Sequence, residues 1–192
     1  MKYILIIIFS FFTFDVIASS DLESAAIART SESITYDGSY FQIPYPNGDV
    51  PSNIGVCTDV IIRSYRKLGI DLQKRLHEDI KANYSSYPSK RIWGLSKPDT
   101  NIDHRRVPNL RVFFSRHGSK LPITSLGADY KVGELVTWML PGNLPHIGIV
   151  TSKKSKDGKR PLIVHNIGRG PMLEDMLFDF KITGHYKYVD KT

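Results

Sequence analysis

A chain of 192 residues is long enough for one domain of ordinary size and too short for two, so any active site must lie within a single core. The hydrophobic fraction of 41% and charged fraction of 23% are typical of a folded soluble protein and exclude a disordered chain. Lys and Arg outnumber Asp and Glu by 26 to 19, and the net charge of +7 favours anionic partners such as nucleic acid, anionic lipid or cell-wall polymers.

Residues 1–18 have the pattern of a cleavable secretory signal peptide. Lys2 provides a basic start, an apolar run extends from Tyr3 to Phe14, and small residues follow from Ala18. The run covers about twelve residues, whereas a membrane-spanning helix needs about twenty, so a permanent anchor is the weaker interpretation. We expect cleavage near Ala18 and a soluble periplasmic or secreted protein with no stable membrane anchor.

The next residues form a lead segment, 19–35, whose spacing of Ala and Ser fits either a first helix or a mobile connection. The predicted domain then comprises residues 36–192. Its first part, Tyr36–Asn53, is rich in Tyr, Pro and turn residues, which predicts an extended, ordered loop. Thr58–Leu68 has the apolar periodicity of a helix and ends at a glycine, which places Cys57 in the first turn.

Helices are expected before strands in the rest of the domain. The sequence predicts a weaker helix over Asp71–Ala82, a polar loop over Asn83–Asp103, a helix over Val107–Arg116, and strands over Leu135–Met139, His146–Thr151, Leu162–Ile167 and Tyr186–Val189. This order predicts an α+β fold in which N-terminal helices pack on a C-terminal antiparallel sheet or half-barrel.

Cys57 is the one cysteine of the chain. A lone cysteine cannot form an internal disulfide, and its commonest role is that of a small buried apolar residue. At a helix N-terminus, however, unpaired amides lower a thiol pKa and can stabilise an oxyanion, although Asp59 opposes the first effect. This placement favours a nucleophile that needs a basic partner.

Two histidines are candidates for that partner. His146 opens an apolar strand, and His165 lies in the next one. A hairpin loop with an even number of residues puts both on one face of the sheet, whereas an odd loop or a bulge separates them. The four-residue loop Ser155–Gly158 would pair His146 with Ile167 and leave His165 one step away on the same face. We therefore expect His146 as the base and His165 as the residue that orients it.

Each of these residues has an alternative role. His165 fits almost equally well as a core histidine bonded to backbone, and Asn166 is then the fallback third member. Arg105, next to Arg106 in a basic segment, either grips a substrate carboxylate or lies in a segment held by an ion pair between Asp103 and one arginine.

The sequence predicts neither a metal nor another cofactor. It has no pair of cysteines and no HExxH motif, which are common sources of zinc ligands. A phosphate-binding glycine loop and a nucleic-acid recognition motif are also missing, so we do not expect nucleic acid as a partner.

Four blocks carry a family resemblance: YDGSYFQIPYPNGDVPSNIGVCTDVIIRSYRKLGIDL, NIDHRRVPNLRVFF, VGELVTWMLPGNLPHIGIV and IVHNIGRGPMLEDMLF. They resemble an uncharacterised bacterial family of unknown function that is grouped with the NlpC-type papain-like cysteine peptidases, over about Thr30–Tyr188. The resemblance implies a papain-like fold, with the nucleophile, base and orienting roles at Cys57, His146 and His165. It also implies that a tyrosine ahead of the cysteine, here Tyr36, contributes to the site.

Residues and resemblance together predict an exported cysteine hydrolase. We expect an amidase or endopeptidase that cleaves amide bonds in peptidoglycan stem peptides through a thioester, with peptidoglycan or another anionic envelope substrate as its partner. The group often has Ser-Gly after its cysteine, where this chain has Thr58 and Asp59, and this difference leaves the substrate open. The alternatives are a papain-like acyl or lipid hydrolase that uses the same residues, and a catalytically inert cell-wall-binding protein.

Overall fold

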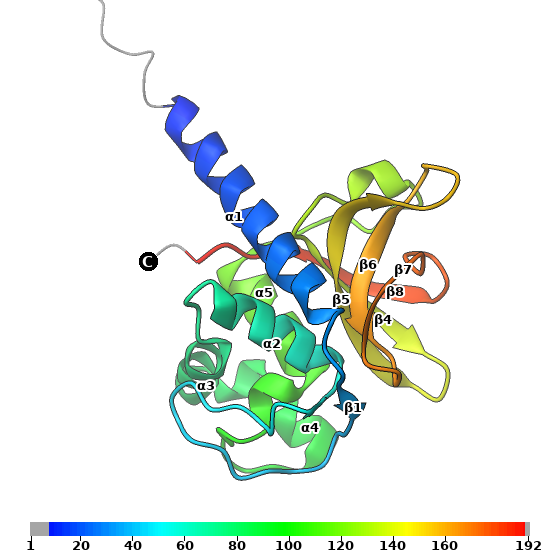
Figure 1. The fold of residues 1–192 in the computed structure, drawn as a ribbon. Helices are drawn as coiled ribbons and strands as arrows, with labels where there is room; N and C mark the ends of the chain where they lie inside the picture. Colours follow the sequence, from blue (N-terminus) through cyan, green and yellow to red (C-terminus); the bar gives the residue numbers. More distant parts are fainter. Residues whose placement is uncertain (1–7, 191–192) are drawn as a thin grey trace, which may run out of the picture.

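The computed structural model describes residues 8–190, with side chains described from residue 19 onward. Its helices are α1 (Ile8–Arg29), α2 (Cys57–Lys67), α3 (Leu72–Ala82), α4 (Ser89–Trp93) and α5 (Val107–His117), with the 3-10 helices η1 (Tyr84–Ser86), η2 (Asp103–Arg105) and η3 (Gly127–Asp129). Its strands are β1 (Thr35–Tyr36), β2 (Ile54–Gly55), β3 (Ser119–Lys120), β4 (Leu135–Leu140), β5 (Leu144–Lys154), β6 (Pro161–Asn166), β7 (Pro171–Glu174) and β8 (Lys181–Lys187). Figure 1 shows α2 to α5 gathered beside the sheet, with the C-terminal part of α1 next to them and its N-terminal part projecting outward.

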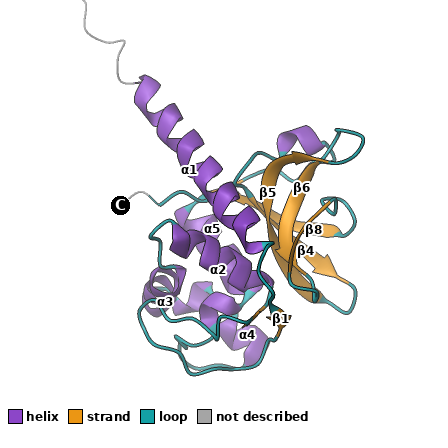
Figure 2. Ribbon diagram, viewed as in Figure 1, coloured by secondary structure: helices purple, strands orange, loops and turns teal. Residues whose placement is uncertain are grey.

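The sheet is antiparallel and has six strands in the order β3-β8-β4-β5-β6-β7. Helices lie against one side of it and the strands curve away, as Figure 2 shows by secondary structure. The predicted α+β class, with helices first and an antiparallel sheet afterwards, is confirmed. A separate parallel pair, β1 with β2, brings Tyr36 opposite Gly55, immediately before the start of α2.

The main core lies between the helices and the central strands. Its members share nearly complete burial and come from every large element; among them are Leu22 of α1, Ile61 and Tyr65 of α2, Phe114 of α5, and Ile147 and Ile149 of β5. Because α2 presents its apolar face to this cluster, its first turn is held against β5. That contact sets where the Cys57 side chain lies.

Helix α1 extends through the predicted cleavage point near Ala18 and continues to Arg29. Of the two alternatives for the lead segment 19–35, the helix is therefore the one observed. Leu22 and Ala26 are buried in the main core, so this part of α1 packs on the domain. The apolar run from Tyr3 begins among residues 1–7, which lie outside the described part of the chain. Across the described residues, no helix combines the length and the apolar character that crossing a membrane requires.

The predicted helices at α2, α3 and α5 and the strands at β4, β5, β6 and β8 are confirmed, with ends that differ by a few residues. The predicted polar loop over Asn83–Asp103 is wrong in part, because it contains η1 and α4. Strand β7 was not predicted. It is only four residues long and follows a glycine-rich turn, so its apolar pattern is too short to detect alone.

The β5–β6 hairpin has the predicted register near His146 but not the predicted loop. Ile149 pairs with Val164, and this register, continued toward the strand start, sets His146 opposite Ile167. The loop is Ser155–Arg160, longer than expected, and a register shift farther along the hairpin compensates for the difference. Both histidines therefore lie on one face, as predicted.

Candidate active site

Cys57 is the first residue of α2, in the position expected for a helix N-terminal thiol. It retains 5% of its surface exposed and belongs to the main core, together with Ile147 of β5. The next residue, Thr58, donates a hydrogen bond from its hydroxyl to the carbonyl of Arg105 at 3.0 Å. The thiol is therefore fixed at the junction of α2 and β5.

The expectation that this position lowers the thiol pKa is wrong. Burial raises the pKa of Cys57 from an ordinary value of 9.0 to about 12, and the charge of Asp59 acts in the same direction. Hydrogen bonding from the Ile147 and Thr58 amides lowers the pKa by less than burial raises it. The helix N-terminus stabilises the thiolate, but the cost of removing the thiolate from water is larger, so the pKa rises. The resting thiol is neutral.

His146 and His165 meet directly. The Nε2 atom of His146 lies 3.0 Å from Nδ1 of His165, and the two rings are almost perpendicular, at 89°. Gly148 permits this approach, since a Cβ there would lie 2.5 Å from a methyl carbon of Ile163 and 3.2 Å from Cβ of His165. Burial and the neighbouring His165 lower the pKa of His146 to about 3, so its imidazole is neutral.

A third group, Glu174 of β7, completes a hydrogen-bonded chain. Its Oε2 atom lies 2.9 Å from Nε2 of His165, and Arg169 approaches its other oxygen at 3.5 Å. A carboxylate only accepts hydrogen bonds, so His165 donates from Nε2 and accepts at Nδ1. His146 must then donate from Nε2, which leaves the lone pair of its Nδ1 atom as the available base. The chain of hydrogen bonds thus assigns both tautomers.

Sequence reasoning missed Glu174 because it missed β7. The pairing of β7 with β6 sets His165 opposite Met172 and Ile163 opposite Glu174. The glutamate therefore sits diagonally across from His165, on the same face. The available signal was the glycine-rich turn segment Gly168–Pro171 (GRGP), which favours a hairpin after the histidine strand.

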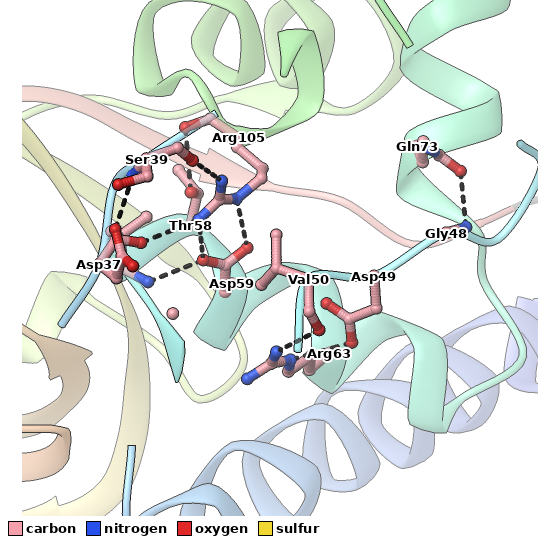
Figure 3. Close-up of polar contacts among 12 residues, drawn as sticks. Asp37, Ser39, Gly48, Asp49, Val50, Thr58, Asp59, Arg63, Gln73 and Arg105 are labelled. Carbon is pink, nitrogen blue, oxygen red and sulfur yellow. Dashed lines mark hydrogen bonds and ion pairs between the residues drawn. The ribbon is translucent and has the colours of Figure 1, made fainter. Parts of the chain in front are cut away.

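Asp59 and Arg105 form a buried ion pair at the start of α2 (Figure 3), and the charge of Asp59 acts on the Cys57 thiol. The guanidinium binds both carboxylate oxygens, at 2.9 and 3.0 Å, and the two side chains are 3% and 2% exposed. Arg105 also donates to the carbonyls of Asp37 and Ser39, and Asp59 accepts from the amide of Val56 at 2.7 Å. The pair therefore ties the start of α2 to the loop that follows Tyr36.

These contacts assign Arg105 a structural position. The expectation that it grips a substrate carboxylate does not fit the geometry, because its donors already bind Asp59 and two backbone carbonyls. The alternative expected for this segment, an ion pair of Asp103 with one arginine, is present between Asp103 and Arg106 at 3.2 Å.

The two remaining candidates differ in their relation to the thiol. Tyr36 lies close enough to Cys57 for the two groups to affect each other's ionisation: burial, then Cys57 and Asp59, raise the pKa of Tyr36 to about 12. Asn166 is buried and bonds elsewhere, from its amide to the carbonyl of Gly55 at 3.4 Å and from its oxygen to the amide of Gly168 at 3.0 Å. Its role is to shape backbone, not to orient His146.

Ring nitrogens of both histidines, His146 and His165, are engaged in hydrogen bonds. Both ring nitrogens of His165 take part in hydrogen bonds, so neither is free to bind a metal ion. Within residues 8–190, no group of three or more His, Cys, Asp or Glu side chains is arranged to hold a metal. We assign no metal or cofactor to these residues.

Comparison with known proteins gives a family match that covers most of the chain. Residues 23–188 match the family described as Domain of unknown function (DUF1287). The uncharacterized protein YijF of Escherichia coli strain K12 is 47% identical over 176 residues, which cover 91% of this chain and 84% of YijF. The matched region begins within α1 and includes every residue of the candidate site. The chain belongs to the DUF1287 family.

Proposed function

We propose that the chain is an exported cysteine hydrolase with an NlpC-type, papain-like fold. The observation that carries the proposal is the hydrogen-bonded series His146–His165–Glu174, which starts on the strand that packs against the first turn of α2. A buried series of this kind has a fixed direction, and its free end is a neutral imidazole base. A helix N-terminal thiol together with a base that a third group holds is the pattern of nucleophilic catalysis.

The charge states determine how the first step proceeds. Cys57 and His146 are both neutral at rest, because burial raises one pKa to about 12 and lowers the other to about 3. The His146 Nδ1 atom takes the thiol proton as sulfur bonds to the substrate carbonyl carbon. The same proton passes to the leaving nitrogen as the C–N bond breaks, which leaves a thioester at Cys57.

The second step reverses these roles. His146 takes a proton from water as the water oxygen attacks the thioester carbonyl, and the proton returns to sulfur when the acid product leaves. In the proposed mechanism, amides in the first turn of α2 and the Tyr36 hydroxyl stabilise the oxyanion of each step. Glu174 holds His165, and His165 holds His146, in the tautomer that both steps require.

The proposed substrate is an amide bond in peptidoglycan stem peptides. Three features support it: the signal-peptide pattern of residues 1–18, the net charge of +7, which suits a wall rich in carboxylates, and the resemblance to NlpC-type peptidases. We propose a periplasmic or secreted location for the same reason.

Two observations favour a second candidate, an inert wall-binding protein. Burial raises the pKa of Cys57 to about 12, which disfavours attack. Side chains also alternate along β5, so that Ile147 shares the main core with Cys57 while His146 faces His165 and Trp138. His146 is the first buried residue of its strand, so the proposed hydrolase requires its imidazole to reach the thiol around the strand start.

Digestion of purified sacculi tests the proposal. The wild-type chain should release soluble fragments with new amino termini, whereas Cys57→Ala and His146→Ala should release none. The matched control is His117→Ala, which removes an exposed histidine outside the site. Equal release by the wild type and both site variants would remove the assignment. Binding to sacculi without release by any variant would establish the inert candidate, and release of fatty acids from envelope lipids would redirect the substrate to an acyl compound.

A further inference from the structure

A second concave region, separate from the candidate active site, has the composition of a binding site. It is a groove of about 1110 Å³ between the η1–α4 segment, α5, β3 and the buried Tyr186 of β8. None of Cys57, His146, His165 or Glu174 lines it. A groove of this size accommodates several units of a polymer.

The groove is strongly cationic. Its lining includes Lys90, Arg91, Arg111, Arg116 and Lys120 and contains no Asp or Glu. Among these five cations, Asp79 neutralises only Arg116, through contacts of 2.7 and 3.1 Å. Within residues 8–190, no carboxylate forms an ion pair with the other four cations. Four positive charges therefore converge on one groove without an internal counter-charge.

One of these cations is held in place by neutral groups. The guanidinium of Arg111 donates to the carbonyl of Thr183 at 2.7 Å and approaches the hydroxyl of Tyr186 at 3.4 Å. These contacts fix its position without cancelling its charge. A guanidinium with spare donors and a fixed position is suited to a carboxylate ligand.

The groove also offers a fixed aromatic surface and hydroxyl groups. The hydroxyl of Tyr84 donates to the carbonyl of Leu95 at 2.6 Å, which fixes the half-buried ring at the groove wall. Ser85, Ser86 and Ser115 add exposed hydroxyls to the lining. Aromatic faces accept the apolar faces of sugar rings, and serines bond to sugar hydroxyls.

We propose that this groove binds a carboxylate-bearing glycan strand, independently of turnover at Cys57. The cations pair with the carboxylates, while the tyrosine ring and the serines contact the sugars. A carboxylated wall polymer is favoured over nucleic acid because the signal-peptide pattern predicts an exported chain, which meets such polymers outside the cytoplasm. The groove would hold the protein on its polymer whether or not that polymer is cleaved.

Co-sedimentation with purified peptidoglycan sacculi tests the groove, using the full chain with Cys57→Ala so that turnover cannot alter the probe. The groove variant carries three charge reversals: Lys90→Glu, Arg91→Glu and Lys120→Glu. The matched control carries the same charge change at the exposed hairpin tip: Lys153→Glu, Lys154→Glu and Lys156→Glu. We expect the groove variant to lose at least about tenfold in affinity and the control to lose less than about twofold.

Equal losses in both variants would overturn the proposal, because they would show a general charge effect. Unchanged binding of the groove variant would overturn it as well. A milder set, Lys90→Gln, Arg91→Gln and Lys120→Gln, should give an intermediate loss and preserve thermal unfolding, which separates binding from folding. Double-stranded DNA that competes as well as soluble peptidoglycan fragments would also contradict glycan recognition. Loss of hydrolysis in Cys57→Ala leaves every one of these outcomes unaffected.

Discussion

Iodoacetamide should alkylate Cys57 far more slowly in the folded chain than in the unfolded chain. The reagent reacts with the thiolate, and burial raises the pKa of this thiol from 9.0 to about 12. At about pH 8, a thiol of pKa near 9 is about one-tenth ionised, whereas one of pKa about 12 is ionised to about one part in ten thousand. The expected difference in rate is therefore about a thousandfold, before any steric protection.

The assay is simple because Cys57 is the one cysteine of the chain. Intact-mass spectrometry follows adduct formation in buffer and, as the control, in concentrated urea. The folded-chain rate should rise about tenfold for each pH unit above neutrality while the chain stays folded. Alkylation of the folded chain at the rate of the unfolded chain would refute the reasoning, because it would show an ionised, accessible sulfur.

Three further predictions concern the groups around the thiol. Glu174→Gln keeps the side-chain shape but removes its charge. On sacculus-derived peptides kcat should fall about five- to tenfold, KM should change little and the pH profile of kcat should shift. An unaltered pH profile would contradict the proposed role of the His146–His165–Glu174 series. In urea titrations, Arg105→Ala should lower the free energy of unfolding by about 3–5 kcal/mol, because the buried carboxylate of Asp59 loses its partner. The control Lys74→Ala, in an exposed ion pair, should lower it by less than about 1 kcal/mol. Similar losses in both variants would contradict a stabilising role for the buried pair. The wild-type free energy of unfolding should fall by about 2–3 kcal/mol from about pH 7.5 to about pH 5.5. His104 and His146 have pKa values of about 3 in the folded chain and near 6.5 in the unfolded chain, so both take up protons on unfolding in this pH range. A free energy of unfolding that does not change with pH would contradict the burial of these histidines.

The elements that carry Cys57 and His146 could be predicted because their signals are local. The apolar periodicity of α2 and the glycine after it lie within a dozen or so residues, and the histidine strands have clear β patterns. The meeting of His146 with His165 was also predictable, since it depends on hairpin register, and hairpin partners are close in sequence.

The ionisation of Cys57 could not be predicted in the same way. It depends on how completely α1, β5 and the rest of the core cover the first turn of α2, and such burial comes from residues far apart in sequence. The same holds for Arg105, whose partner Asp59 is 46 positions away. The sequence shows that Cys57 lies at a helix N-terminus, which lowers a thiol pKa, but it does not show how deeply the thiol is buried. That burial raises the pKa by more than the helix N-terminus lowers it.

The most direct test of the account is whether a substrate acyl group becomes attached to Cys57. Intact-mass spectrometry after brief incubation with soluble peptidoglycan fragments, stopped with acid, measures this. The account predicts an adduct on the wild-type chain that hydroxylamine removes and that Cys57→Ala never forms. Fragment cleavage with no adduct at Cys57, or the same adduct on Cys57→Ala, would contradict it.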